Sequence, residues 1–237
     1  MTATPKPPQD WLAALPKNRL LAEMSLWSAD LGAVAADAKR VAAFTDIFHV
    51  DVADGHFSPA LLYFPDLLVA VRKVTEKPIH VHLMVSDAVL LSQVEQFVEA
   101  GADLISIHAE NENAVEAFSV IRKAAIATGV VLQLHTPVAA AEKFLPFIDM
   151  LTLLGTAIGV KGQGLSDYAM DRIKEARTLV AKQQARYIIV AADGGIREHT
   201  VPGLRAAGAQ TIVMGSLAFG AADLSARMAW VHGLKEM

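Results

Sequence analysis

The feature that most constrains the fold is a regular alternation of short apolar runs with longer segments of helical period. Eight runs rich in apolar and β-branched residues predict strands at residues 20–25, 45–52, 78–84, 103–108, 129–135, 148–154, 186–193 and 210–215. Segments long enough for several helical turns lie between them, including residues 29–44, 87–100, 113–128, 167–184 and 222–235. This alternation is typical of an α/β protein with a parallel sheet.

The alternation consists of a repeated helix–turn–strand unit. Ala-Gly-Ala joins a predicted helix to the next strand twice, at residues 100–102 and 207–209, with glycine where a helix commonly ends in left-handed backbone. Eight such units in 237 residues fit one (β/α)8 barrel, or TIM barrel. An open doubly wound sheet would alternate similarly, but no G-x-G-x-x-G follows the first strand.

We therefore expect residues 19–237 to form a single barrel domain and residues 1–18 to form an N-terminal extension. The extension contains Trp11 and Leu12, and two interpretations of it stay open. It forms either a short helix across the N-terminal face of the barrel or a partly ordered tail.

Composition narrows the classes of partner. Hydrophobic residues make up 53% of the chain and charged residues 19%, which supports a large core. The net charge is −4 and the basic residues are scattered, so we expect neither nucleic acid nor a membrane as partner. Since the chain has no cysteine, any metal must be bound by His, Asp or Glu. The first residues lack the apolar run of a secretory signal, which predicts a cytoplasmic protein.

Histidine and aspartate residues gather at the carboxyl ends of the predicted strands. His49 and Asp51 lie two apart on one strand, so both point to the same side; His82 and Asp193 lie near the ends of two others. In a barrel these ends meet on one face. Singly, each is more typical of a wall or turn residue, but two imidazoles and two carboxylates together predict a divalent metal site. Three further histidines are expected to be structural or to support the ligands: His56, His80 and His108.

Glycines follow the last two predicted strands. Asp193-Gly194-Gly195 ends the seventh strand, and Gly215-Ser216 follows the eighth. The loops after strands seven and eight of a TIM barrel are a recurrent phosphate site, where backbone N–H groups face the anion. Glycine also serves ordinary tight turns, but its placement after two neighbouring strands favours a phosphate site.

Together these motifs resemble the ribulose-phosphate 3-epimerase family over residues 20–219. The longest matching stretch is HVDVADGHF at residues 49–57, and further matches are SLWSAD at 25–30, HLM at 82–84, HAE at 108–110, DGG at 193–195 and GS at 215–216. The resemblance implies a TIM barrel of the ribulose-phosphate binding type. It also implies an isomerase of carbohydrate metabolism that inverts C3 of a phosphorylated ketose, converting D-ribulose 5-phosphate to D-xylulose 5-phosphate in pentose phosphate chemistry.

The same resemblance implies roles for individual residues. One divalent metal (zinc, iron, manganese or cobalt) would be held by His49, Asp51, His82 and Asp193. Epimerisation beside a ketone needs two acid/base groups on opposite faces of a planar enediolate, and Asp51 and Asp193 are the expected catalytic pair. Substrate contacts are expected from Ser25, Met84, Gly162, Gly194, Gly195, Gly215 and Ser216. The family further implies a homo-oligomer.

The chain departs from the family pattern around the substrate. Where the family usually has NPGFGGQ after the sixth strand, residues 157–163 read AIGVKGQ. Ala53 and Leu154 stand at two positions where the family has methionine. Two residues are candidates for altered specificity: Lys161 in this loop and His135 at the end of the fifth predicted strand. A ketohexose, ketotetrose or L-pentulose phosphate therefore stays open as the substrate.

Two other functions stay open. A related phosphate-binding barrel could decarboxylate or isomerise a sugar phosphate, but those enzymes typically carry a D-x-K-x-x-D-like pattern on the third strand, where residues 80–84 read HVHLM. The other alternative is a non-catalytic sugar-phosphate binding protein. Against it stands the presence of all four expected ligands and both expected acid/base residues.

Overall fold

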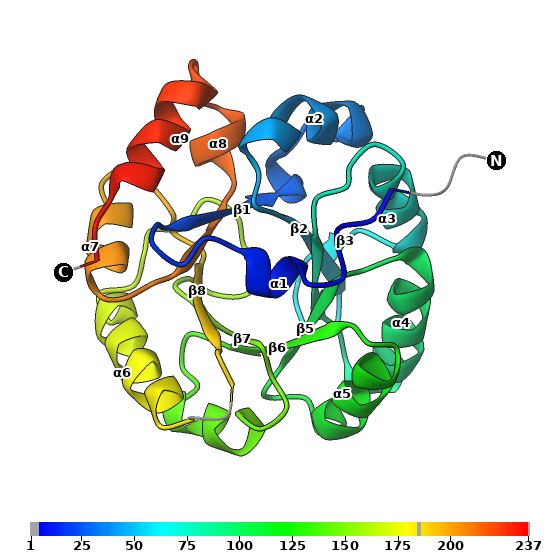
Figure 1. Cartoon of the computed structure of the whole chain (residues 1–237). Helices are drawn as coiled ribbons and strands as arrows, with labels where there is room; N and C mark the ends of the chain where they lie inside the picture. The colour runs from blue at the N-terminus through cyan, green and yellow to red at the C-terminus, as the bar shows by residue number, and fades with distance from the viewer. Residues whose placement is uncertain (1–4, 184–185, 237) are drawn as a thin grey trace.

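A computed structural model describes residues 5–183 and 186–236 (Figure 1). Within these ranges the barrel wall consists of eight parallel strands: β1 (Leu21–Ser25), β2 (Ile47–Asp54), β4 (Ile79–Met84), β5 (Leu104–His108), β6 (Ala127–Leu132), β7 (Met150–Leu154), β8 (Ile189–Asp193) and β9 (Thr211–Met214). The sheet closes because β1 pairs with both β2 and β9. The closed sheet confirms the predicted TIM barrel and excludes the open doubly wound sheet.

Helices cover the outside of the barrel (Figure 1). The α-helices around the wall are α2 (Val34–Val41), α3 (Pro65–Arg72), α4 (Asp87–Ala100), α5 (Ala114–Lys123), α6 (Ala169–Ala181), α7 (Val201–Ala206), α8 (Ser216–Phe219) and α9 (Leu224–Gly233). Three segments of the described chain are 3-10 helices: η1 (Leu26–Ser28), η2 (Ala42–Phe44) and η3 (Val138–Phe144). The predicted helix over 167–184 ends earlier than expected, at Ala181, and residue 184 lies outside the described residues.

The strands are buried on both faces, which explains why they appear in the sequence as nearly continuous apolar runs. Every residue of β1, β4, β5 and β7 is buried. The repeated Ala-Gly-Ala turn is also confirmed, because Gly101 ends α4 and Gly208 follows α7 with φ angles of 98° and 105°. These are left-handed conformations that side-chain-bearing residues rarely adopt.

The prediction was wrong at the end of the fifth predicted strand. Expected over 129–135, β6 instead ends at Leu132, and His135 lies exposed in the turn that follows. The backbone groups of Gln133 are bound by side chains: its N–H donates to Glu110 over 3.1 Å and its carbonyl accepts from Arg172 over 2.9 Å. Because these contacts replace pairing with a neighbouring strand, the chain leaves the sheet before His135.

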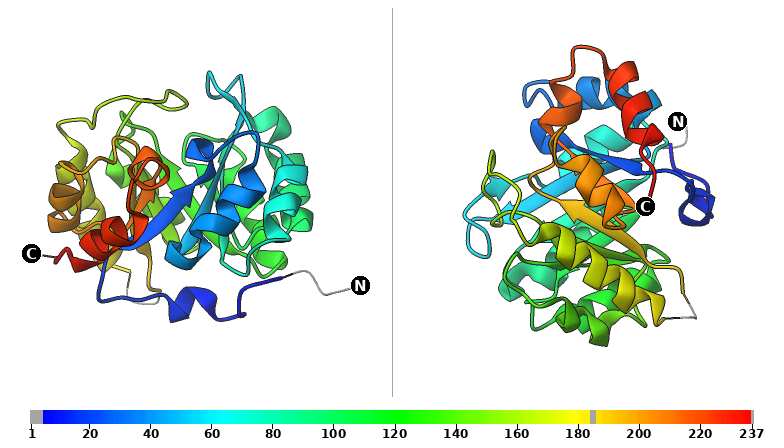
Figure 2. Two further views of the ribbon diagram at one scale, coloured as in Figure 1. Left: turned by 90° about the horizontal axis from the view of Figure 1, so that it is seen from above. Right: turned by 90° about the vertical axis from the view of Figure 1, so that its left-hand side faces the viewer.

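A short strand that the sequence did not predict, β3 (Leu61–Leu62), pairs antiparallel with the last residues of β2. It belongs to a loop that rises above the barrel at the end where the strands finish, beside the loop that follows β7 (Figure 2). These two loops therefore stand on the same side of the molecule as the polar strand ends.

Helix α1 (Trp11–Ala14) lies across the opposite end of the barrel (Figure 2). Trp11, Leu12 and Leu15 pack against a cluster in the N-terminal halves of the strands, formed by Ile47, Leu104, Met150, Ile189 and Ala191. The short-helix interpretation of the extension is thus confirmed for its described part, while residues 1–4 lie outside it. The domain division after residue 18 stays a prediction.

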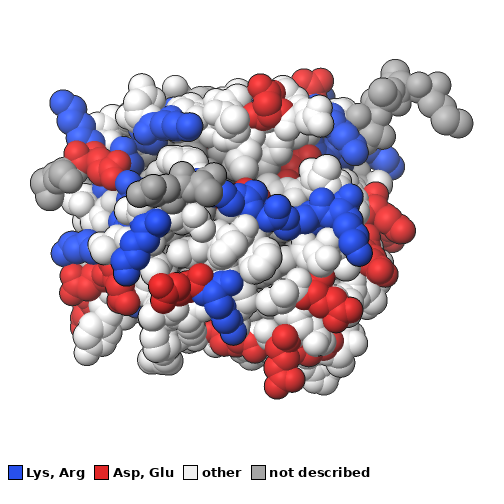
Figure 3. Space-filling model, turned by 60° about the horizontal axis from the view of Figure 1, so that its bottom comes forward, with Lys and Arg blue, Asp and Glu red and all other residues white. Residues whose placement is uncertain are grey.

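The outer surface carries both signs of charge on the face shown in Figure 3, where Lys and Arg lie among Asp and Glu. None of the helices in the described part of the chain has the length and apolar character needed to cross a membrane.

Candidate active site

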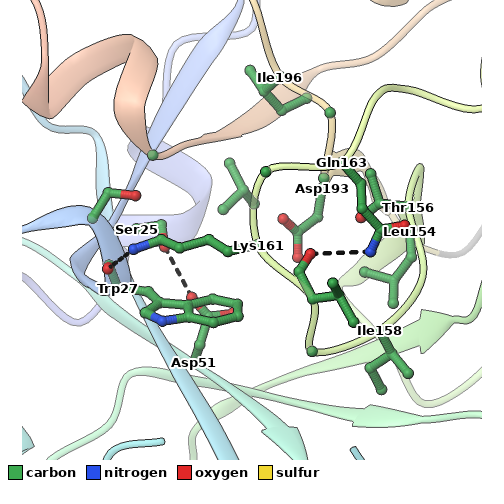
Figure 4. Close-up of a pocket in the computed structure, with 18 of the residues that line it drawn as sticks. Ser25, Trp27, Asp51, Leu154, Thr156, Ile158, Lys161, Gln163, Asp193 and Ile196 are labelled. Atoms are coloured by element: carbon green, nitrogen blue, oxygen red, sulfur yellow. Dashed lines mark hydrogen bonds between the residues drawn. The ribbon is translucent and has the colours of Figure 1, made fainter. Parts of the chain in front are cut away.

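A cavity of about 360 Å³ opens at the carboxyl ends of the strands. Ser25 from β1, Asp51 from β2 and Asp193 from β8 contribute to its lining (Figure 4). His82 from β4 lines the same cavity. These side chains lie far apart in the sequence and meet because parallel strands of a closed barrel all end on one face.

The four predicted metal ligands form one cluster. His49, Asp51, His82 and Asp193 each offer a ligand atom, and these atoms all lie within 4.8 Å of one another. His49 Nε2 lies 3.3 Å from Asp51 Oδ1 and 4.0 Å from Asp193 Oδ2. His82 Nδ1 lies 3.4 Å and 3.6 Å from the same two oxygens. Two nitrogens and two carboxylate oxygens therefore converge on one point.

Two nitrogens of this cluster, His49 Nε2 and His82 Nδ1, are buried without a hydrogen-bond partner among the described residues. The other nitrogen of each ring is engaged, His49 Nδ1 with Glu23 Oε2 at 3.0 Å and His82 Nε2 with His108 Nε2 at 2.9 Å. Imidazoles that bind metals typically have this arrangement, with the second nitrogen hydrogen-bonded. Because leaving buried polar atoms unsatisfied is unfavourable by about 1–3 kcal/mol each, a divalent metal fits this donor set.

The two carboxyl groups of the cluster have opposite electrostatic environments. Burial alone would raise the pKa of Asp51, but the adjacent His49 and His82 rings outweigh it and hold that pKa below its usual range. Burial raises the pKa of Asp193, and the negative charge of Asp51 adds to this rise although His49 opposes it. One carboxyl group thus favours the ionised form and its neighbour the protonated form, which is the asymmetry that a proton acceptor and a proton donor require.

A buried acidic residue beneath the cluster was missed by the sequence analysis. Glu23, in the middle of β1, has an exposed fraction of 0%. Its Oε2 lies 3.0 Å from His49 Nδ1 and 2.7 Å from His80 Nδ1, and its Oε1 accepts from Thr211 over 3.2 Å. Burial would raise the pKa of Glu23, but His80 and His49 outweigh it and lower that pKa. An acidic residue inside an otherwise apolar strand was the sequence signal that could have revealed it.

The expected supporting histidines divide into two groups. His80 and His108 are fully buried and each contacts a carboxylate, His80 through Glu23 and His108 through Glu110 at 3.2 Å. His56, in contrast, is exposed in the loop after β2. The structure therefore brings two of the three next to the ligand cluster.

The glycine-rich strand ends lie on the cavity wall as well. Gly194, Gly195, Gly215 and Ser216 all line it. Gly195 has a φ of 69°, and a Cβ there would lie 2.7 Å from the backbone of Leu165. Glycine at this position is thus required by the tight packing of the loop, and the absence of a side chain also leaves the backbone open to the cavity. Arg197, which the sequence analysis did not single out, lines the cavity nearby.

The loop after β7 forms another wall of the cavity (Figure 4). Lys161 reaches from this loop across the cavity, where its Nζ donates to the main-chain oxygen of Trp27 over 2.5 Å and lies 5.3 Å from the centre of the indole ring. Gly162 and Met84 also line the cavity, as does Leu154. His135 is exposed and is not among the lining residues, so of the two candidates for altered specificity the structure brings Lys161 to the site.

The fold and the site together define a TIM barrel with a candidate metal centre and a candidate acid/base pair at the carboxyl ends of its strands. The family model described as the ribulose-phosphate 3 epimerase family matches residues 21–219. A relative named ribulose-phosphate 3-epimerase, from Bacillus subtilis (strain 168), is 32% identical to this chain, and the match covers 89% of this chain and 97% of that protein. Another relative of the same name, from Treponema pallidum (strain Nichols), is 37% identical, with 72% of this chain and 78% of that protein covered. This chain belongs to the ribulose-phosphate 3-epimerase family, a family of carbohydrate epimerases.

Solved structures share the architecture at lower identity. 3-Hexulose-6-phosphate synthase from Salmonella typhimurium has a TM-score of 0.68 at 17% identity, with 91% of this chain and 98% of that chain covered. 3-Keto-L-gulonate-6-phosphate decarboxylase from Vibrio cholerae O1 biovar El Tor has a TM-score of 0.67 at 15% identity, with 90% and 99% covered. At these identities the likeness shows the fold alone, and it does not favour the decarboxylase alternative over epimerisation.

Proposed function

We propose that this protein is a metal-dependent epimerase that inverts C3 of a phosphorylated ketose, with D-ribulose 5-phosphate and D-xylulose 5-phosphate as the substrate pair. The observation that carries the proposal is the cluster that Asp51 and Asp193 form with His49 and His82 at one cavity. The opposite pKa shifts of the two carboxyl groups support it. The family membership and the names of the relatives support the same reaction.

The two aspartates would move the protons. Asp51, ionised, accepts the C3 proton of the substrate, and Asp193, protonated, returns a proton to the opposite face of the planar enediolate. After one turnover the protonation states of the two groups are exchanged, so the reverse reaction uses them in opposite roles. Ser25 donates to Asp51 Oδ2 over 2.9 Å, which keeps the carboxylate plane from rotating as the proton arrives.

His49, Asp51, His82 and Asp193 are the proposed metal ligands, and zinc, iron, manganese and cobalt all accept such a set of nitrogen and oxygen donors. When bound, the metal supplies Lewis-acid stabilisation of the negative charge that develops on the ketone and adjacent hydroxyl oxygens. The two unpartnered nitrogens, His49 Nε2 and His82 Nδ1, support this assignment.

The remaining wall residues would bind the rest of the substrate. Gly194, Gly195, Gly215 and Ser216 are proposed to contact the phosphate, with Met84 against the reacting carbons. Lys161 and Gly162 from the loop after β7 would cover the sugar. Because this loop differs from the family pattern, a ketohexose, ketotetrose or L-pentulose phosphate remains the alternative substrate.

We also propose a location and an oligomeric state for the protein: it is cytoplasmic and forms a homo-oligomer. Cell fractionation and light scattering of the purified protein test these two statements.

Proton NMR in heavy water tests the reaction directly. The metal-loaded protein is mixed with D-ribulose 5-phosphate, and the C3 proton signal is followed together with the signals of D-xylulose 5-phosphate. We expect deuterium at C3 and formation of the epimer, both absent with Asp51→Asn. A metal-loaded protein that exchanges no proton with this substrate or with the other ketose phosphates would overturn the proposal.

A further inference from the structure

Glu23 lies one layer below the candidate metal cluster and is the only carboxylate in the described chain that contacts both His49 and His80. Its two oxygens are surrounded by three donors: the Nδ1 atoms of His49 and His80, and the hydroxyl of Thr211. The separations of 3.0 and 2.7 Å from Glu23 Oε2 to the two Nδ1 atoms are hydrogen-bond lengths. A carboxylate oxygen accepts in such a bond, so each facing imidazole nitrogen is the donor and carries a proton.

This requirement determines the tautomer of His49. With the proton on Nδ1, the lone pair of a neutral ring is on Nε2, the atom that faces Asp51 Oδ1 at 3.3 Å and has no hydrogen-bond partner among the described residues. The opposite tautomer would place a proton where the metal is proposed to bind. It would also leave Nδ1 as an acceptor facing a carboxylate, which is repulsive.

His80 extends the same pattern away from the cavity. Its Nδ1 faces Glu23 at 2.7 Å and its Nε2 faces the hydroxyl of Ser106 at 2.7 Å. With Nδ1 as donor, Nε2 accepts from Ser106, so both ring nitrogens are satisfied. All of these side chains are buried with exposed fractions of 0%, which leaves Glu23 little freedom to rotate.

The second imidazole of the cluster is supported differently. His82 Nε2 faces His108 Nε2 at 2.9 Å, and His108 Nδ1 faces Glu110 at 3.2 Å. Here the carboxylate acts through an intervening ring, whereas Glu23 contacts His49 directly. Glu110 has a side chain that is 24% exposed, while that of Glu23 is 0% exposed. The buried, direct contact is the stronger constraint because water does not compete for it.

We propose that Glu23 is a positioning residue for the metal site: it holds His49 in the Nδ1–H tautomer and in the orientation that directs Nε2 toward Asp51 and Asp193, and His80 holds Glu23 in place. The inference rests on the proposed metal site of the preceding section. It concerns no contact between Glu23 and the substrate, since Glu23 is not among the residues that line the cavity.

A second metal ion is the competing explanation. Ligand atoms of Glu23, His49 and His80 also lie within 4.8 Å of one another. However, the separations of 2.7 and 3.0 Å from Glu23 Oε2 are hydrogen-bond lengths, and no nitrogen of His80 is left unpartnered in the described chain. Hydrogen bonding therefore accounts for this group without a second ion, and metal stoichiometry separates the two explanations.

The first test measures metal affinity in the full-length protein. We expect wild type to bind one equivalent of Zn²⁺ or Mn²⁺ in a chelator competition assay, and Glu23→Gln to bind one equivalent about 10–100-fold more weakly, the usual effect of losing such a partner. Thr211→Val is the matched control, because it removes a hydrogen bond from Glu23 Oε1 without touching His49. Its affinity should stay within about threefold of wild type.

The second test needs no variant and covers the case in which Glu23→Gln does not fold. Long-range proton–nitrogen NMR of Zn²⁺-loaded wild type reports which nitrogen of His49 carries the proton and which one binds the metal. We expect the proton on Nδ1. A proton on Nε2, or an unchanged affinity in folded Glu23→Gln, would overturn the inference. Binding of two equivalents by wild type and one by Glu23→Gln would make Glu23 a ligand and overturn it as well.

These outcomes are separable from the fate of the proposed function. A wild-type protein that binds one metal but epimerises no ketose phosphate would contradict the proposed reaction and leave the role of Glu23 measurable by affinity and NMR. If the wild type is an active epimerase and Glu23→Gln binds metal with unaltered affinity, only the proposed role of Glu23 is contradicted.

Discussion

Ser25 donates its hydroxyl proton to Oδ2 of Asp51 over 2.9 Å, while Oδ1 of the same carboxylate faces His49 and His82. The two oxygens of Asp51 therefore have separate partners. Oδ1 belongs to the candidate metal cluster, and Oδ2 is held by a residue that lines the cavity. A single carboxylate is thus placed to bind metal and to exchange a proton, and substitutions can separate the two roles.

Asp51→Asn removes the proton acceptor and one anionic ligand together. We expect kcat to fall by at least about 10³-fold, within the range for losing a general base, and metal affinity to fall as well. Ser25→Ala is the comparison variant, because it removes only the hydrogen bond to Oδ2 of Asp51. We expect its kcat to fall about tenfold and its metal affinity to stay unchanged. Steady-state kinetics and metal titration measure both. Turnover of Asp51→Asn near that of wild type would contradict the two-carboxylate mechanism.

Asp193→Asn should separate proton removal from inversion. With Asp51 intact, the variant should still exchange the C3 proton of one epimer with solvent, but it should not form the other epimer, since no group remains to act on the opposite face. Proton NMR in heavy water, started separately from each epimer with metal at saturating concentration, measures this. Equal exchange from both epimers would show that Asp193 is not the second acid/base group.

Lys161→Ala should weaken substrate binding. Its ammonium group crosses the cavity to the main-chain oxygen of Trp27, so its loss opens one wall and removes a positive charge near an anionic substrate. We expect KM to rise about tenfold, equivalent to about 1.4 kcal/mol, with a smaller change in kcat. Lys161→Arg retains the charge and should raise KM by less than about threefold. An unchanged KM in Lys161→Ala would show that the residue does not act on substrate binding.

Trp11→Ala tests the helix that covers the N-terminal end of the barrel. Trp11 packs on the cluster containing Ile47 and Met150, so its removal should lower the free energy of unfolding by about 2 kcal/mol and Tm by about 4–8 °C. Tyr168→Ala is the control, since Tyr168 is 74% exposed and should change stability by less than about 0.5 kcal/mol. Activity at 25 °C should be unaffected, because the cavity lies at the opposite end.

Acid stability should depend on Glu110. Burial would raise its pKa, but hydrogen bonds from His108 and Thr136 outweigh it and lower the pKa from 4.5 to about 2. A carboxyl group with a lower pKa in the folded state stabilises the fold above pH ~4.5 and loses that contribution as the pH falls toward ~2. Between pH 5 and ~2, the free energy of unfolding measured in urea should therefore fall less in Glu110→Gln than in wild type. The difference between the two decreases should be about 2 kcal/mol or less. Equal slopes would contradict this assignment.

The barrel and most of the candidate site could be predicted because both follow from local patterns. Apolar runs of strand length alternate with helical segments, and closed parallel strands place His49, Asp51, His82 and Asp193 on one face. The error at His135 arose because Glu110 and Arg172, both distant in sequence, bind the backbone of Gln133 and end β6 early. No pattern within residues 129–135 indicates such contacts.

By itself, then, the sequence determined the order of strands and helices, the family and the identity of the polar residues at the strand ends, since these depend on local period and on short motifs. The tertiary structure decided which groups meet. Glu23 contacts His49 and His80, and Lys161 reaches Trp27, only because the barrel closes and sets the stagger of its strands. The opposite pKa shifts of Asp51 and Asp193 likewise depend on burial and on charges contributed by other strands, which no single segment of the chain contains.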